Sequence, residues 1–172
     1  MEKLIRGLFF LFGVLLITSC MTHKKLPKVQ EEFMLNGKIT SNDLISDIRF
    51  PWFQDNYKKY HLNDTVINLI KEFPFELKVL IFMGTWCEDS KNEVPKFYKI
   101  AHALKFYDAQ IEMIAVDRNK HCDSMDMSSY KIGLVPTFIF YKEGKEIGRI
   151  IETPHETLEK DLLKILNDAK IK

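Results

Sequence analysis

The chain has 172 residues, of which 46% are hydrophobic, and this is enough apolar material for the core of one globular domain. Its 25 basic and 24 acidic side chains give a net charge of +1 and are interspersed along the sequence. A balance of this kind is typical of a solvated surface and gives no reason to expect a nucleic-acid partner.

The first residues, MEKLIRGLFFLFGVLLITSC, carry Lys3 and Arg6 ahead of an apolar run from Leu8 to Ile17. The run is about ten residues long, whereas a membrane-spanning helix needs roughly twenty, so we expect a secretory signal. The ending ITSC resembles the bacterial lipobox, whose cysteine is lipid-modified after cleavage. We therefore expect residues 1–19 to be a lipoprotein signal peptide and Cys20 to be the lipidation site. An ordinary signal peptide with a chance cysteine is the alternative.

A polar, proline-containing stretch follows, and we expect residues 20–37 to be the lipid anchor and a tether. The mature chain would then be held at the bacterial cell envelope by its lipid and would face the periplasm, where thiols tend to be oxidised. Met21 stands where some lipoproteins carry an aspartate that retains them at the inner membrane, which favours the outer membrane. With Cys20 used as the anchor, Cys87 and Cys122 remain for thiol chemistry.

Residues 38–74 are predicted to form a helical N-terminal extension. Cap-forming residues open TSNDLISDI, and NDTVINLIKEF has apolar side chains at helical spacing until Pro74 interrupts the pattern. We expect the aromatic segment FPWFQDNYKKYH, at 50–61, to pack these helices onto a sheet. Binding of a partner by this segment is the alternative.

From residue 77 onward, strand patterns alternate with helix patterns and the chain closes with a hairpin and a helix. The predicted elements, in chain order, are a strand at 77–84, a helix at 92–107, a strand at 110–117, a short helix at 126–133, a hairpin at 136–151 with its turn at Glu143 and Gly144, and a helix at 155–170. Alternation implies parallel pairing through crossovers, and the hairpin adds antiparallel pairing. The sequence therefore predicts an α/β fold with a mixed sheet.

Several features of this region stand in register with a known family. They are the Trp86-Cys87 pair at the end of the first strand, Lys91 after the turn, Pro95 eight residues beyond the cysteine, the Val135-Pro136-Thr137 triplet and the hairpin FYKEGKEIG. Together they resemble the thioredoxin-like lipoproteins of bacteria. The resemblance implies that residues 75–172 form a thioredoxin-like domain, a central mixed sheet flanked by helices, behind the helical extension.

Cys87 is the predicted nucleophile. A cysteine at a strand-to-helix junction faces the free N–H groups and the dipole of the first helical turn, which favour a thiolate. A capping box at Ser90 and Glu93 offers the alternative that the helix begins at Ser90 and leaves Cys87 in the loop.

The resemblance also implies the roles of the neighbouring residues. Ser90 would donate a hydrogen bond to the thiolate, and Trp86 would shield the sulfur and form part of the substrate surface. The Val135-Pro136 bond would be cis, so that the edge formed by Val135, Pro136 and Thr137 pairs with an extended peptide.

The motif departs from that family in three ways that point in one direction. Ser90 stands where dithiol members have a second cysteine, and a hydroxyl cannot resolve a mixed disulfide. Glu88 and Asp89 oppose a neighbouring thiolate, so we expect a moderate nucleophile. Ile81 replaces the buried acid that many members place in the first strand to deprotonate the second cysteine. All three favour exchange by one thiol.

Cys122 is a possible resolving residue. It lies five residues beyond Asp117, a span of at most about 17 Å, and at the edge of the sheet that carries Cys87. An ordinary loop cysteine is the alternative. Three adjacent side chains such as His121, Cys122 and Asp123 rarely converge on one zinc ion, so we expect no metal and no cofactor.

We therefore expect an envelope lipoprotein that reduces or isomerises disulfides through Cys87, with protein thiols or disulfides as its substrates. An external thiol reductant, a thiol within the substrate or Cys122 would release the mixed disulfide. The alternative is a thioredoxin-like module that binds an extended peptide or a partner protein without turnover.

Overall fold

A computed structural model describes residues 33–74 and 76–171 of the chain, which belong to one compact unit, Glu32–Lys172. The predicted signal peptide at 1–19, the lipidation site Cys20 and most of the tether at 20–37 lie outside the described residues. No helix in the described part of the chain is long and apolar enough to cross a membrane.

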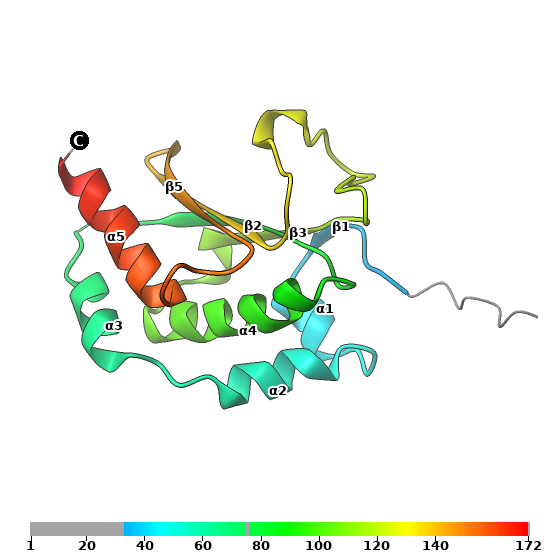
Figure 1. Cartoon of the computed structure of the whole chain (residues 1–172), viewed down its shortest axis with the longest axis horizontal. Helices are drawn as coiled ribbons and strands as arrows, with labels where there is room; N and C mark the ends of the chain where they lie inside the picture. Colours follow the sequence, from blue (N-terminus) through cyan, green and yellow to red (C-terminus); the bar gives the residue numbers. More distant parts are fainter. Residues whose placement is uncertain (1–32, 75, 172) are drawn as a thin grey trace, which may run out of the picture. The chain divides into compact units, whose positions relative to one another are not determined.

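A mixed sheet forms the centre of this unit (Figure 1), as the sequence predicts. Its strands, in the spatial order β1-β3-β2-β4-β5, are β1 (Gly37–Ile39), β3 (Ile111–Ala115), β2 (Lys78–Met83), β4 (Thr137–Lys142) and β5 (Lys145–Ile151). The β2–β3 pair is parallel, whereas β1–β3, β2–β4 and β4–β5 are antiparallel. The hairpin between β4 and β5 turns at Glu143 and Gly144, both with positive φ, as expected.

Strand β2 lies in the middle of the sheet, between β3 and β4. Its side chains are buried on both faces because other parts of the chain cover each face of the sheet. Successive side chains point to opposite faces. Val79, Ile81 and Met83 therefore join one core cluster, while Leu80 and Phe82 join another. The second core cluster, as we call it, consists of Leu80, Phe82, Ile114, Val116, Cys122, Val135 and Ile139.

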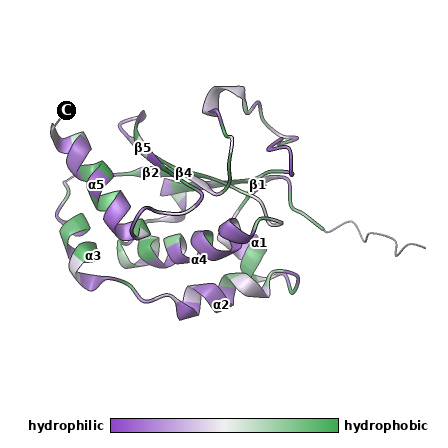
Figure 2. Ribbon diagram, in the orientation of Figure 1, coloured by the Kyte–Doolittle hydropathy of each residue, from purple (hydrophilic) through white to green (hydrophobic). Residues whose placement is uncertain are grey.

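Helices cover the face of the sheet to which Val79, Ile81 and Met83 point, with α4 closest to the sheet and α2 packed on α4 (Figure 1). The helices are α1 (Ser41–Ile45), α2 (Pro51–Lys59), α3 (Asp64–Lys71), α4 (Glu88–Ala103) and α5 (Leu158–Ile171), with short 3-10 turns η1 (Asp108–Gln110) and η2 (Ser128–Tyr130). Helices α4 and α5 carry alternating hydrophobic and hydrophilic residues (Figure 2), because one side of each faces the core and the other faces solvent.

Local signals start each of the first three helices. Thr40 and Asp43 form a capping box at α1, and Pro51 occupies the first turn of α2, where its missing N–H costs nothing. The side chain of Asn63 accepts a hydrogen bond from the Val66 N–H at the start of α3. Three helices in the 38–74 region agree with the predicted helical extension.

The prediction of helix from residue 38 differs from the structure at its first residues, because Gly37–Ile39 is strand β1. Ile39 is buried while Lys38 is exposed and pairs with Glu112 on β3, an alternation typical of a strand. The strand exists because it pairs with the edge of β3, with Gly37 opposite Ala115. Part of the expected extension is therefore a strand of the central sheet.

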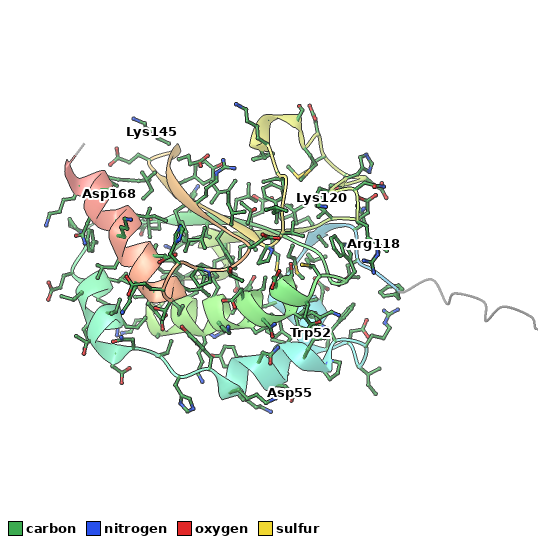
Figure 3. All side chains as sticks on the ribbon, viewed as in Figure 1. Trp52, Asp55, Arg118, Lys120, Lys145 and Asp168 are labelled. Atoms are coloured by element: carbon green, nitrogen blue, oxygen red, sulfur yellow. The ribbon has the colours of Figure 1, made fainter. Side chains whose placement is uncertain are left out.

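The aromatic segment at 50–61 has the expected packing role, but it packs the N-terminal helices onto α4 and not directly onto the sheet. Phe53 is 2% exposed, and its ring centroid lies 5.7 Å from that of Tyr98 on α4. The Tyr57 hydroxyl lies 2.8 Å from Nδ1 of His102. Asp55 projects from the outer side of α2 (Figure 3), so the helix is amphipathic.

Candidate active site around Cys87

Cys87 is the N-cap of α4. Strand β2 ends at Met83, the chain turns through Gly84 to Trp86, and the Cys87 N–H donates to the Gly84 carbonyl at 2.9 Å. Because α4 begins at Glu88, the alternative in which the helix begins at Ser90 is wrong. The half-buried sulfur therefore lies at the first turn of a long helix, where free N–H groups and the dipole favour an anion.

Ser90 is fully buried, and its hydroxyl oxygen accepts a hydrogen bond from the Gly84 N–H at 3.2 Å. This contact explains why Ser90 does not cap a helix of its own: its side chain closes the turn that precedes the cysteine. The hydroxyl proton is not used in that bond. Donation of this proton to the Cys87 thiolate stays a prediction.

The Cys87 thiol donates to the carbonyl oxygen of Val135, with Sγ and O 3.0 Å apart. The Val135-Pro136 peptide bond is cis, as the resemblance implied. The Pro136 carbonyl accepts from the Glu152 N–H at 2.7 Å, and the Thr137 hydroxyl donates to the Leu134 carbonyl at 2.7 Å. These bonds fix the loop so that the Val135 carbonyl faces the sulfur.

Trp86 lies beside the thiol on the β3 side of the sheet. Its indole N–H donates to the Val116 carbonyl at 2.9 Å, and its ring packs on the second core cluster. A Cβ built on Gly84 would lie only 2.5 Å from Cε2 of this ring, so only glycine fits beneath it. The Arg118 guanidinium and the Lys120 ammonium lie 5.0 and 5.7 Å from the ring centroid.

Cys122 is 2% exposed and belongs to the second core cluster, against which Cys87 and Trp86 also pack. Its sulfur lies 3.3 Å from the Ser124 hydroxyl, and both Cys87 and Cys122 are free thiols. The fold thus brings both cysteines to one cluster. A resolving role for Cys122 stays a prediction.

Sequence reasoning missed three hydrogen bonds made by the segment before β1. The Asn36 side chain donates to the His121 carbonyl at 3.1 Å and accepts from the Asp123 N–H at 2.8 Å, so it holds the backbone on both sides of Cys122. The Leu35 N–H donates to the Thr85 hydroxyl at 3.1 Å. All three bonds join residues at least 50 positions apart, and no local pattern signals such pairs.

The remaining charged groups near the cysteine lie at the surface. The Glu88 carboxylate is 78% exposed and lies 3.5 Å from the Lys91 ammonium. Ile81 is fully buried in the core cluster that also contains Val79 and Met83, so strand β2 brings no acid to this site. Among the described residues no group of three or more His, Cys, Asp or Glu side chains is placed to hold a metal ion.

Comparisons with known proteins show which proteins this chain resembles. The family model for thioredoxin matches residues 52–165. Thioredoxin H5 of Oryza sativa subsp. japonica is 31% identical over 81 residues, which are 47% of this chain and 56% of the rice protein. Thioredoxin H2 of Arabidopsis thaliana is 32% identical over 99 residues, which are 57% of this chain and 68% of that relative.

Among solved structures, a protein of unknown function from Pseudomonas aeruginosa matches with a TM-score of 0.54 and 12% identity. The match covers 78% of this chain and 92% of that chain, and at this identity it shows the fold alone. The chain spans little more than half the length of the rice relative named above.

Proposed function

Because the chain belongs to the thioredoxin family, we propose that it exchanges thiols and disulfides of proteins through the single thiol of Cys87. The observation that carries the proposal is the position of this sulfur. It is half-buried at the first turn of α4 and 3.0 Å from the Val135 carbonyl beside the cis-proline. The similarity to thioredoxins supports a redox function, and the Ser90 side chain supports the monothiol form of it.

The first step is the attack of the Cys87 thiolate on one sulfur of a substrate disulfide. A bond forms between Cys87 and that sulfur, the substrate S–S bond breaks, and the second substrate sulfur leaves as a thiolate that takes up a proton. The helix dipole and the free N–H groups of the first turn favour the attacking anion. No net oxidation of the protein and substrate taken together occurs in this step.

The second step frees Cys87 through another thiol. In isomerisation, a thiolate within the same substrate attacks the substrate sulfur of the mixed disulfide and forms a new substrate disulfide. In net reduction, an external dithiol reductant supplies two electrons: its first thiolate attacks the substrate sulfur and its second completes its own disulfide. Ser90 does not attack the mixed disulfide in either reaction, because an oxygen cannot replace the resolving sulfur.

The edge at Val135, Pro136 and Thr137 holds the substrate chain during these steps. Once Cys87 is a thiolate or is bonded to substrate, the Val135 carbonyl no longer receives the S–H donor and can accept a backbone N–H of an extended peptide instead. Trp86 covers one side of the sulfur and contributes apolar surface. Substrate binding and sulfur chemistry therefore share one carbonyl group.

We place this reaction at the cell envelope. The signal-like run at 1–19 and the lipobox-like ITSC support attachment through a lipid on Cys20, with the domain facing the periplasm. Metabolic labelling with a radioactive fatty acid tests the anchor. Label should enter the wild-type protein and be absent from Cys20→Ala, and equal labelling of both would contradict attachment through Cys20.

A trapping experiment tests the exchange. Wild type, Cys87→Ala and the matched control Cys122→Ala are incubated with disulfide-containing envelope proteins, quenched with acid and alkylated, and mixed disulfides are identified by mass spectrometry. We expect mixed disulfides in wild type and Cys122→Ala and none in Cys87→Ala. Noncovalent partners that bind wild type and Cys87→Ala equally, with no mixed disulfide in either, would favour a binding module without turnover.

A further inference from the structure

An exposed apolar side chain stands in the turn between α1 and α2. Ile48 is 94% exposed, the highest value for a large apolar side chain in the described part of the chain. The turn that presents it is closed by the Phe50 N–H, which donates to the Asp47 carbonyl at 3.0 Å. Such turns usually hold glycine, proline, asparagine, aspartate or serine, so neither turn geometry nor core packing explains an isoleucine here.

Two further apolar side chains beside this turn are open to solvent. Ile45, which is 41% exposed, ends α1 three residues before Ile48, and Phe33 is 49% exposed. The ring centroid of Phe33 lies 6.3 Å from that of Phe50, and the Arg49 guanidinium lies 3.4 Å above the Phe33 ring. Phe33 therefore packs against the two residues that follow Ile48. We call the three side chains Phe33, Ile45 and Ile48 the apolar face.

Two acidic groups beside the apolar face already have partners. The Asp47 carboxylate accepts from the Arg49 backbone N–H and forms an ion pair with the guanidinium of the same residue. The Asp43 carboxylate accepts from the backbone N–H and the hydroxyl of Thr40 in the capping box of α1. Covering the face with an apolar surface therefore strands neither of these two carboxylates without a partner.

The apolar face lies at the end of the compact unit that carries the candidate active site. Leu35, two residues after Phe33, donates its N–H to the Thr85 hydroxyl at 3.1 Å, and Thr85 stands two residues before Cys87. Figure 1 shows the α1–α2 turn at the end of the unit where α4 begins, which is the Cys87 end. A surface that covers the apolar face therefore also approaches the turn that holds the thiol.

The chain that leads to the apolar face starts at the proposed lipidation site. Phe33 lies 13 residues beyond Cys20, a span of at most about 45 Å. A lipid on Cys20 therefore keeps a bilayer within that distance of Phe33, and a surface tethered so closely is met at a high effective concentration. Of the surfaces that could cover the apolar face, the bilayer is the one that the chain itself brings to it.

We propose that Phe33, Ile45 and Ile48 insert into the interface of the bilayer that holds the anchor, so that the domain lies against the membrane surface. The inference rests on the proposed anchoring through Cys20 and goes beyond it, because an anchor alone leaves the domain free to turn in any direction. Insertion removes the three apolar side chains from water, and the gain grows with the apolar area that is buried. The docked domain then holds the Cys87 turn beside the membrane.

Quenching of Trp52 by brominated lipid tests the contact. Trp52 lies four residues beyond Ile48, at the start of α2 (Figure 3), and its ring centroid is 5.9 Å from that of Phe50. Trp86→Phe leaves it as the single tryptophan of the chain. The full lipidated chain is reconstituted in phosphatidylcholine vesicles with brominated or unbrominated acyl chains, and vesicle-bound protein is collected by flotation. Bromine quenches a ring only at short range, so the loss of Trp52 emission measures docking.

Two substitutions in this background separate the apolar face from the anchor. Ile48→Ser removes the most exposed apolar side chain, and Leu69→Ser is the matched control, because Leu69 is 44% exposed on α3 at the other end of the unit (Figure 1). We expect the ratio of docked to undocked protein to fall at least about three-fold in Ile48→Ser, since even half burial of an isoleucine side chain changes an equilibrium by that factor. The ratio should be kept in Leu69→Ser and at high salt.

The other outcomes contradict the docking in distinguishable ways. Equal quenching with and without Ile48→Ser would overturn it, and so would the absence of quenching in protein that floats with the vesicles. Shielding of Trp52 that requires a high density of protein on the vesicles, without quenching by bromine, would assign the apolar face to a second copy of the chain. If the chain neither floats with vesicles nor takes up fatty acid, the anchor is wrong and the docking falls with it, whereas exchange through Cys87 does not depend on this result.

Discussion

Gly84→Ala tests whether the packing of Trp86 depends on a bare backbone beneath its ring. The added Cβ would lie 2.5, 2.7 and 2.9 Å from three indole atoms, whereas ordinary van der Waals contacts begin at 3.4 Å. The ring must therefore move by about 1 Å, an overpacking that typically costs about 1–3 kcal/mol. That movement also weakens the 2.9 Å bond from the indole N–H to the Val116 carbonyl, a further loss of about 1 kcal/mol.

We expect Gly84→Ala to lower the free energy of unfolding by about 2–4 kcal/mol, the sum of the two contributions. Urea unfolding followed by circular dichroism measures this value, and the near-ultraviolet signal reports the displacement of Trp86. Gly133→Ala is the matched control, because a Cβ at Gly133 meets nothing within 4 Å and the residue does not have a positive φ. The control should change stability by less than about 1 kcal/mol.

A loss below about 0.5 kcal/mol in Gly84→Ala, with an unchanged near-ultraviolet spectrum, would refute this reasoning, because such a value is within the range of ordinary surface substitutions. An equal loss in Gly133→Ala would refute it in another way, since the effect would then not depend on the Trp86 ring.

Three further substitutions test the groups that build the site and fix the helices. Ser90→Ala leaves the buried Gly84 N–H without its acceptor, so unfolding should become easier by about 1–3 kcal/mol in urea, and a smaller loss would contradict the hydrogen bond. Asn36→Ala removes both bonds to the loop around Cys122, so amide hydrogen exchange at 119–123 should speed up. In a Cys87→Ala background Cys122 should also react faster with thiol reagents. An unchanged rate of this reaction would contradict the role of Asn36 in holding the loop. Burial, and then the hydrogen bond to Glu159, raise the pKa of Tyr60 above its ordinary value of 10.0. The unfolded chain therefore loses this proton at a lower pH than the native protein, so stability is fully present below pH 10 and falls as the pH rises above it; Tyr60→Phe should flatten this fall in alkaline thermal melts, and an unchanged slope would contradict it.

The central sheet could be predicted from sequence because its strands are marked by local composition. The apolar run of β2 and the turn at Glu143 and Gly144 are signals within a few residues, and the structure confirms them. Strand β1 could not be predicted in this way. It has three residues, and it forms because the edge of β3 offers backbone partners far along the chain.

Only part of the candidate site could be predicted from local sequence patterns. The Trp86-Cys87 pair and the cis bond at Pro136 came through a family resemblance, since X-Pro bonds are cis in only about 5–6% of cases and no local pattern marks this one. Local pattern was misleading at Ser90, where the capping-box sequence was real but the hydroxyl accepts from Gly84 instead. Asn36 holds the backbone on both sides of Cys122 from 85 or more positions away, so no local sequence pattern could indicate these bonds.

The proposed function requires that Cys87 alone carries the exchange. Intact-mass and peptide-mass measurements after incubation with excess glutathione disulfide test it in wild type, Cys87→Ala and Cys122→Ala. We predict one glutathione per chain, on Cys87, in wild type and Cys122→Ala, stable until a thiol reductant is added, and none on Cys87→Ala. An adduct that resolves by itself into a Cys87–Cys122 disulfide, or one that forms on Cys122 in the native protein, would contradict the claim.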